Sequence, residues 1–295
     1  MNQPRRVEHQ QTDKGYVPIY TTTVIEQPWE GYSADDHATW GTLYQRQREL
    51  LVGRACDEFL AAQDAMGMTP DRIPRFTELN EVLRAATGWT LIGVEGLLPE
   101  LDFFDHLAHR RFPVTWWIRR PDQIDYIAEP DLFHDLFGHV PLLMNPVFAD
   151  YMEAYGRGGV KAHGIGADAL QYLTRLYWYT VEFGLIDTKD GLRIYGAGIV
   201  SSKGESLYSL ESDAPNRIGF DLERIMRTRY RIDTYQKTYF VIDSFEQLMD
   251  ATAPDFTPIY ARLAEQPAIP AGSVLDGDRV HARGTGEGWL ADGDV

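Results

Sequence analysis

The chain has 295 residues, of which 44% are hydrophobic and 24% charged, so it can bury one full-sized core or at most about two, and general disorder is excluded. Its formal net charge of −16 disfavours nonspecific attraction to nucleic-acid phosphate or to an anionic membrane surface. We therefore expect small-molecule partners, with no nucleic acid and no membrane among them.

The number of cysteines and the length of the apolar runs indicate the cellular compartment of the protein. The single cysteine, Cys56, cannot form a disulfide within the chain, and the N-terminal residues contain no apolar run of signal-peptide length. The longest nearly apolar stretch, 176–186, is shorter than the roughly 20 residues that a membrane helix needs. These features favour a reducing, cytoplasmic location.

The two ends of the chain differ in composition from its middle. Residues 1–29 are polar and without steady periodicity, which predicts a loosely ordered arm. Residues 266–295 are acidic and glycine-rich, which predicts a surface tail anchored by Trp289 and Leu290. Since no linker, repeat or low-complexity run interrupts residues 30–265, we expect one compact domain there.

The predicted elements of this domain are mostly helical. Ser33 followed by Asp36 is a capping pattern, and it begins a long helix whose apolar stripe reaches Leu51. Further helices are expected over 76–86, 100–109, 131–137, 146–156, 168–183, 221–227 and 244–263, the last broken by Pro254 and Pro258. The β-rich pieces, too few and too scattered for a parallel sheet with crossover helices, are 89–94, 114–118, 193–195 and 238–242. The fold class is therefore mainly α, with small antiparallel β pieces.

Two histidines five residues apart are the first chemical signal. On a continuous α-helix, His134 and His139 would lie roughly 140° apart, too far round to share one metal. We therefore expect the helix to end between them, with Gly138 as a left-handed terminator and Pro141 as a stop. The alternative is a pair of partly buried histidines bonded to backbone carbonyls.

A glutamate inside an apolar helical stretch is the second signal. Glu182 is expected to be buried with its neighbours, and an unpaired buried carboxylate needs a cation. That cation is either Arg175, seven residues back on the same face, or a metal held by the two histidines. Two histidines and a carboxylate fit both a non-haem Fe(II) oxygenase site and a hydrolytic His₂Glu zinc site.

Three longer motifs occur in order along the chain: EPDLFHDLFGHVPLL at 129–143, YWYTVEFGL at 177–185 and YGAGIVSS at 195–202. Over residues 30–265 the chain resembles the catalytic domain of the pterin-dependent aromatic amino acid hydroxylases. The resemblance implies Fe(II) held by His134, His139 and Glu182 as the catalytic and metal-binding residues. It also implies a tetrahydropterin (tetrahydrobiopterin or a related reduced pterin), O₂ as co-substrate, and monooxygenase para-hydroxylation of L-phenylalanine to L-tyrosine, the first step of phenylalanine catabolism.

Several substrate-binding positions follow from the same resemblance. Arg119 corresponds to the arginine that holds the amino acid carboxylate, for which a planar fork is suited. Trp178 and Pro130 resemble residues that border the substrate ring, and Ser201 and Glu205 resemble residues near the substrate or a ligand histidine. The alternatives are a surface arginine, ordinary core packing and ordinary loop hydrogen bonding.

The pterin-binding positions rest on resemblance alone. An aromatic platform with loop backbone beside it is expected to hold the flat ring system, and two polar residues near the metal helices are expected to reach it. These positions are Gly96, Leu97, Leu98, Phe103, Asp135 and Tyr177.

Other functions remain open on the sequence. The chain could hydroxylate tryptophan or tyrosine within the same family, although Ile232 is apolar where tyrosine-hydroxylating relatives carry an acid, which favours phenylalanine. It could also be a His₂Glu zinc hydrolase or a noncatalytic binder of an amino acid or pterin. Because the regulatory and oligomerisation modules of larger family members have no counterpart here, we expect a monomer.

Overall fold

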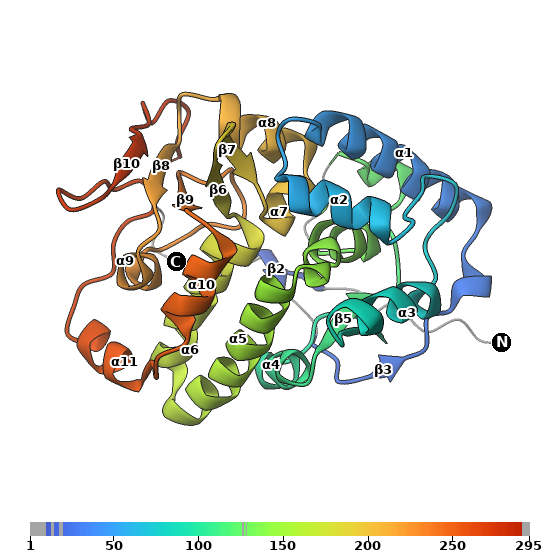
Figure 1. Cartoon of the computed structure of the whole chain (residues 1–295), viewed down its shortest axis with the longest axis horizontal. Helices are drawn as coiled ribbons and strands as arrows, with labels where there is room; N and C mark the ends of the chain where they lie inside the picture. Colours follow the sequence, from blue (N-terminus) through green and yellow to red (C-terminus); the bar gives the residue numbers. More distant parts are fainter. Residues whose placement is uncertain (1–9, 13–14, 18–19, 126, 128, 291–295) are drawn as a thin grey trace. The chain divides into compact units, whose positions relative to one another are not determined.

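A computed structural model of the chain describes residues 10–12, 15–17, 20–125, 127 and 129–290 (Figure 1). Residues 1–9 of the predicted arm lie outside the described residues. Further along it, Gln10–Thr12 (β1) and Gly15–Val17 (β2) pair as antiparallel strands. The chain divides into two compact units, the first made of residues 1–46 and 61–160, the second of 47–60 and 161–295.

Helices dominate the first unit, as predicted. The capping pattern at Ser33 is confirmed, because the Asp36 backbone N donates to Ser33 Oγ at 3.1 Å and the Ser33 backbone N donates to Asp36 Oδ2 at 2.8 Å. The helices that lie in this unit wholly or in part are α1 (Ala34–Leu51), α2 (Asp57–Ala65), α3 (Phe76–Ala86), α4 (Glu100–Ala108) and α5 (Pro146–Ile165). A short 3-10 turn, Trp29–Gly31, precedes α1.

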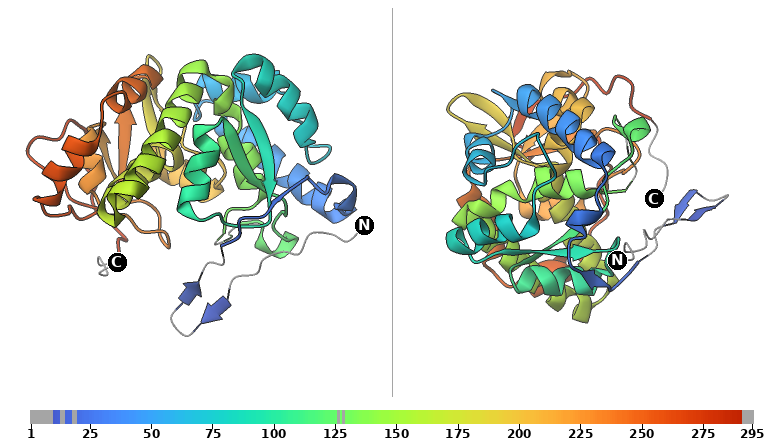
Figure 2. Two further views of the ribbon diagram at one scale, coloured as in Figure 1. Left: turned by 90° about the horizontal axis from the view of Figure 1, so that it is seen from below. Right: turned by 90° about the vertical axis from the view of Figure 1, so that its right-hand side faces the viewer.

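A three-stranded sheet completes the first unit. Its order is β3 (Val24–Ile25), β4 (Thr90–Val94), β5 (Arg111–Thr115). The strands β4 and β5 are connected through α4 and run parallel to each other (Figure 2). The prediction of only antiparallel pieces without crossover helices is therefore wrong for this sheet. Parallel strands need a crossover connection, and the segment that contains α4 supplies it here.

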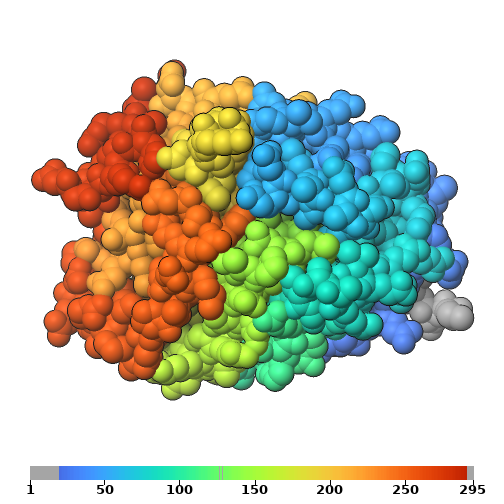
Figure 3. All heavy atoms as spheres, viewed as in Figure 1, coloured from blue at the N-terminus to red at the C-terminus, as the bar shows by residue number. Residues whose placement is uncertain are grey.

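The second unit holds the larger sheet. Its helices are α6 (Ala167–Tyr177), α7 (Ala197–Val200), α8 (Lys203–Glu211), α9 (Leu222–Arg227), α10 (Phe245–Thr252) and α11 (Thr257–Ala264). The predicted break at Pro254 and Pro258 thus separates α10 from α11, whose outer faces are seen in orange in Figure 3. Its strands are β6 (Leu185–Thr188), β7 (Gly191–Ile194), β8 (Asn216–Gly219), β9 (Thr238–Ile242) and β10 (Val280–Ala282).

Strand β9 lies in the middle of this sheet, and all five of its residues are buried. The strand order is β10-β8-β9-β6-β7, in which β9 pairs parallel with both neighbours and the outer pairs are antiparallel. The antiparallel prediction is therefore confirmed for the outer pairs and wrong for the inner ones. The mainly α fold class is confirmed. Among the described residues, no helix combines the length and apolar character that crossing a membrane requires.

Candidate metal centre

The two histidines lie on a π-helix, η3, which spans His134–His139. The backbone N of Val140 donates to Asp135 O at 3.3 Å, the i to i+5 bond that defines this wider turn. Gly138 lies inside the turn and not in the left-handed conformation, so the prediction that the helix ends between the histidines is wrong. The physical solution is different: a π-turn brings residues five apart to the same face without interrupting the helix.

As a result, the two imidazoles meet. The Nε2 atoms of His134 and His139 are 3.1 Å apart, and the ring planes cross at 82°. His139 is buried beside Phe112, with ring centroids 5.1 Å apart, while His134 is half-buried. The chain therefore aims two nitrogen lone-pair positions at nearly the same point.

The predicted carboxylate comes from a second π-helical segment, η5, which spans Trp178–Glu182 and continues α6. Its i to i+5 bond runs from Phe183 N to Trp178 O at 2.9 Å. Glu182 is half-buried, so the prediction that it is buried with its neighbours is wrong. Arg175, the alternative partner, directs its guanidinium to Met226 O at 3.1 Å and to Gln171 Oε1 at 2.9 Å.

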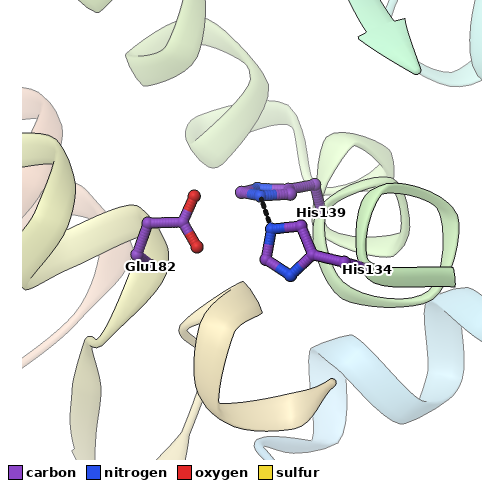
Figure 4. A group of neighbouring side chains, drawn as sticks. All are labelled: His134, His139 and Glu182. Carbon is purple, nitrogen blue, oxygen red and sulfur yellow. Dashed lines mark hydrogen bonds between the residues drawn. The ribbon is translucent and has the colours of Figure 1, made fainter. Parts of the chain in front are cut away.

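His134, His139 and Glu182 each offer one ligand atom, and these atoms all lie within 4.8 Å of one another. Figure 4 shows the two imidazoles extending from one helical segment and the Glu182 carboxylate pointing toward them. Within the described part of the chain, this is the one group of three or more histidine, cysteine, aspartate or glutamate residues that could hold a metal ion. The observed set is two imidazoles and a carboxylate, as the sequence predicted.

A buried acid, Asp135, lies within η3. Asp135 Oδ2 accepts a hydrogen bond from Thr115 N at 2.7 Å, which ties the π-turn to the end of β5. Burial raises the pKa of the Asp135 carboxyl to about 7, although the neighbouring His139 opposes the shift. The hydrogen bond to Thr115 N gives Asp135 a structural role. The predicted role of Asp135 toward pterin stays a prediction.

Arg119 is buried and fixed by an ion pair. Its Nε donates to Asp131 Oδ2 and its Nη2 to Asp131 Oδ1, both at 2.8 Å, and its backbone N also donates to Asp131. Burial alone would raise the pKa of the Asp131 carboxyl, but the Arg119 guanidinium and the backbone N–H groups of Arg119 and His134 together lower it below its ordinary value. The alternative of a surface arginine is wrong. The Nη1 edge of the guanidinium is the part that these bonds leave for a further acceptor.

Asp131 also contacts the first turn of η3. Its Oδ1 accepts a hydrogen bond from the backbone N of His134 at 3.0 Å, so one carboxylate orients both the arginine and the first turn of η3. The sequence analysis did not single out this residue. The available signal was an acid three residues before a histidine, which is the spacing of an N-terminal helix cap.

The other predicted substrate residues are distributed as follows. Pro130 lies in the loop just before η3, and Trp178 begins η5. Ser201 is buried and donates to Ala197 O at 2.7 Å. Glu205 is buried on α8, where burial raises the pKa of its carboxyl to about 7.

The predicted pterin residues lie on two elements of the first unit and at the end of α6. Gly96 to Leu98 form the bend between β4 and α4, and the Leu97 carbonyl accepts from Thr21 N at 2.8 Å. Phe103 lies on α4, with its ring centroid 5.9 Å from that of Phe104. Tyr177 is the last residue of α6.

Comparison with known proteins decides the family. The model of the biopterin-dependent aromatic amino acid hydroxylases matches residues 20–258. The chain belongs to this family. It is 65% identical over 271 residues to phenylalanine-4-hydroxylase of Ralstonia nicotianae, covering 92% of the chain and 86% of that relative. It is 64% identical to the Chromobacterium violaceum phenylalanine-4-hydroxylase, covering 92% of the chain and 91% of the relative.

Solved structures give the same result for the fold. The Chromobacterium violaceum phenylalanine hydroxylase structure with bound oxidised Fe(III) superposes with a TM-score of 0.85 at 65% identity, covering 87% of this chain and 93% of that one. A cobalt-bound structure of the same enzyme superposes with a TM-score of 0.86 at 63% identity, covering 89% and 95%. The family resemblance read from the sequence motifs is confirmed.

Proposed function

We propose that this chain is a phenylalanine 4-monooxygenase that uses a non-haem Fe(II) centre, a reduced pterin and O₂ to convert L-phenylalanine to L-tyrosine. The observation that carries the proposal is the convergence of His134, His139 and Glu182 within a chain of this hydroxylase family. Relatives at up to 65% identity that bear the name phenylalanine-4-hydroxylase support the choice of substrate. The reaction would serve phenylalanine catabolism, and we infer a monomeric, cytoplasmic enzyme.

The donor set fits iron. Two nitrogens bound at about 2.1 Å lie about 3.0 Å apart when they meet an ion at a right angle and about 3.4 Å apart at a tetrahedral angle. The observed 3.1 Å between the two Nε2 atoms lies within this range, so both nitrogens could face one ion. Two imidazoles and one carboxylate leave further positions open, and iron bound there supplies the redox chemistry of oxygen activation, with electrons from the pterin.

The chain's own residues supply position. His134, His139 and Glu182 would hold the metal, and Arg119 would receive one carboxylate oxygen of phenylalanine on its Nη1 edge while Asp131 holds the opposite edge. The ion pair thereby fixes the guanidinium before substrate arrives, which reduces the entropy lost on binding. We place the aromatic ring of the substrate near Trp178 and Pro130.

The pterin would lie near the bend Gly96–Leu98 and Phe103, with Asp135 and Tyr177 as polar neighbours. A flat aromatic face such as Phe103 stacks on a planar bicycle, and the bend supplies backbone donors and acceptors for its edge. The Leu97 carbonyl already accepts from Thr21, so we assign the edge contacts to the other backbone groups of the bend.

One assay tests the function. Oxygen uptake is measured with L-phenylalanine, Fe(II) and tetrahydrobiopterin, the product is identified, and each component is omitted in turn. Tyrosine formation that requires all components supports the proposal, with Glu182→Ala as the inactive control. Activity without oxygen, with zinc in the purified protein, would instead identify a hydrolase, and ligand binding without oxygen uptake would identify a binder.

A further inference from the structure

The segment 229–236 is attached to η5 at three points, all within the second unit. Tyr179 Oη donates to Arg229 O at 2.6 Å. The Trp178 indole stacks on Tyr230, with ring centroids 4.3 Å apart and planes at 17°. The indole Nε1 donates to Gln236 Oε1 at 2.9 Å. Two successive residues of the π-turn are therefore fixed by a segment fifty or more positions further along the chain.

Gln236 is buried, and its contacts determine how it faces Trp178. Its side-chain Nε2 donates to Arg231 O at 3.1 Å and to Thr234 O at 3.4 Å. With the amide nitrogen turned to two carbonyls, the amide oxygen must face the indole N–H. If the amide flipped, its oxygen would face the Arg231 and Thr234 carbonyls and its nitrogen would face the indole N–H. Both arrangements are unfavourable, so the amide keeps the observed orientation.

Glu205 anchors Gln236 in turn. The Glu205 side chain is 5% exposed, and its Oε1 accepts from Gln236 N at 3.1 Å and from Tyr239 Oη. Its own backbone N donates to Ser202 Oγ at 3.3 Å in the N-terminal cap of α8. The contacts of Glu205 thus hold the loop to α8 and β9.

A π-turn needs such support because it is rare and competes with the α-helical register of the same residues. In η5 the i to i+5 bond from Phe183 to Trp178 sets where Glu182 points relative to Trp178. A change to the α register would rotate Glu182 away from this direction. Fixing Trp178 and Tyr179 from outside the helix opposes that change.

We infer that Glu205 and Gln236 are positioning residues that act through Trp178 to hold the Glu182 carboxylate in the direction required of a metal ligand. The inference rests on the metal site of the proposed function. It gives Glu205 a role different from direct contact with substrate. Support of a ligand by its neighbours typically changes metal affinity 10- to 100-fold, and because this support acts through a further residue, we expect about tenfold.

The experiment titrates the metal-free full-length protein with Co(II) and measures the dissociation constant from the visible absorption of the bound ion. Gln236→Leu and Glu205→Ala are expected to weaken Co(II) binding about tenfold. Glu205→Gln retains an oxygen acceptor for Gln236 N and Tyr239, so its affinity should stay within about twofold of the unmodified protein. Gln247→Leu, which removes an amide from α10, is the matched control and should leave the affinity unchanged.

Trp178→Phe keeps an aromatic ring for stacking but removes the indole donor, and it is expected to weaken Co(II) binding as Gln236→Leu does. Combining the two changes should add little, because both break the same hydrogen bond. The inference is overturned if the single variants fold with unchanged Co(II) affinity, or if their effects multiply in the double variant. Loss of thermal stability alone, with affinity retained, also overturns it.

These outcomes are separable from failure of the proposed function. If the unmodified protein binds Co(II) and the variants bind it more weakly, while no tyrosine forms under any condition, the positioning role stands and the proposed reaction fails. If the unmodified protein forms tyrosine and the variants bind Co(II) normally, the reaction stands and the positioning role fails.

Discussion

Arg119 shows how one buried side chain is held in a fixed orientation by another. Because its Nε and one Nη2 hydrogen are already bonded to the buried Asp131, the guanidinium is held in one orientation. A lysine has neither the fork nor the second donor edge. It cannot keep the Asp131 pair and also reach a substrate carboxylate.

We therefore predict that Arg119→Lys raises the KM for L-phenylalanine about tenfold or more while the KM for tetrahydrobiopterin changes less than threefold, consistent with about 1.4 kcal/mol per tenfold change. Steady-state kinetics in each substrate at saturation of the other will measure both values. Because Asp131 also contacts His134 N, the metal content of the variant must be checked beside the kinetics. An equal increase in the KM for both substrates would argue against a role of Arg119 in holding the phenylalanine carboxylate.

Glu205 predicts a pH dependence of stability. Burial raises the pKa of its carboxyl from an ordinary 4.5 to about 7, so the folded protein holds this proton more tightly than the unfolded chain does. The stability that this bound proton contributes is fully present below pH 4.5 and is lost as the pH rises through 7. A difference of this size corresponds to about 3 kcal/mol in the free energy of unfolding.

Glu205→Gln removes the titration and keeps the acceptor. We expect the free energy of unfolding of the variant, minus that of the unmodified protein, to increase as the pH is raised from 5 to 8, by at most about 3 kcal/mol. Urea unfolding at both pH values measures the gain, and the two proteins should differ least at pH 5. A constant difference at both pH values would show that the carboxyl does not titrate in this range.

At the scale of elements, the close approach of Gly196 to η5 is the feature with a direct consequence. A Cβ on Gly196 would lie 2.4 Å from Glu182 O and 2.5 Å from Gly184 N, both backbone atoms that cannot turn aside. Gly158, inside α5, has nothing within 4 Å of the same position. The two glycines therefore form a matched pair for substitution.

We predict that Gly196→Ala destabilises the protein by about 1–3 kcal/mol and weakens metal binding, because the backbone that carries Glu182 must shift. Gly158→Ala should stabilise it by about 0.5–1 kcal/mol, since alanine is the better residue inside a helix. Thermal unfolding and Co(II) titration of both variants measure these effects. An unchanged metal affinity in Gly196→Ala would show that the approach to Glu182 is unimportant for the site.

The elements also show what the sequence could and could not predict. Helix α3 was predicted with its observed bounds because its apolar period is strong, whereas β5 was placed three residues too late at its start. The convergence of His134, His139 and Glu182 was predicted from residue type and motif. Their π-turns were not, because side-chain spacing does not show whether a backbone bond closes after four residues or five. Parallel pairing was missed because strands this short carry no periodic signal for direction.

At the scale of the whole molecule, the C-terminal residues contribute more to the second unit than their composition suggests. Strand β10 pairs with β8, and Asp278 accepts from Arg224 Nε at 2.9 Å, with both side chains nearly buried. Trp289 packs against Gly272, and Lys237 lies over its ring at 5.6 Å. The predicted domain boundary at residue 265 stays a prediction, and these contacts indicate how to test it.

Truncation after Glu265 is expected to lower the free energy of unfolding by at least about 3 kcal/mol, because it removes the Asp278 carboxylate and the Ser273 carbonyl that bind the Arg224 guanidinium. Asp278→Asn in the full chain should lose part of this amount, since the amide oxygen still accepts. Differential scanning calorimetry compares the three proteins. A truncated chain with an unchanged melting temperature would place residues 266–295 outside the folding unit.

The π-turn at His134–His139 has a consequence for chain length. Deleting one residue from 135–138 would leave the histidines four apart, a spacing that an ordinary α-helix also presents on one face. Both imidazoles could then still meet, because a π-turn that loses its extra residue can close as an ordinary α-turn with the chain on either side kept in phase. The wider turn therefore accommodates one extra residue between the two histidines while the chain that follows, from Pro141–Met144 onward, keeps its direction.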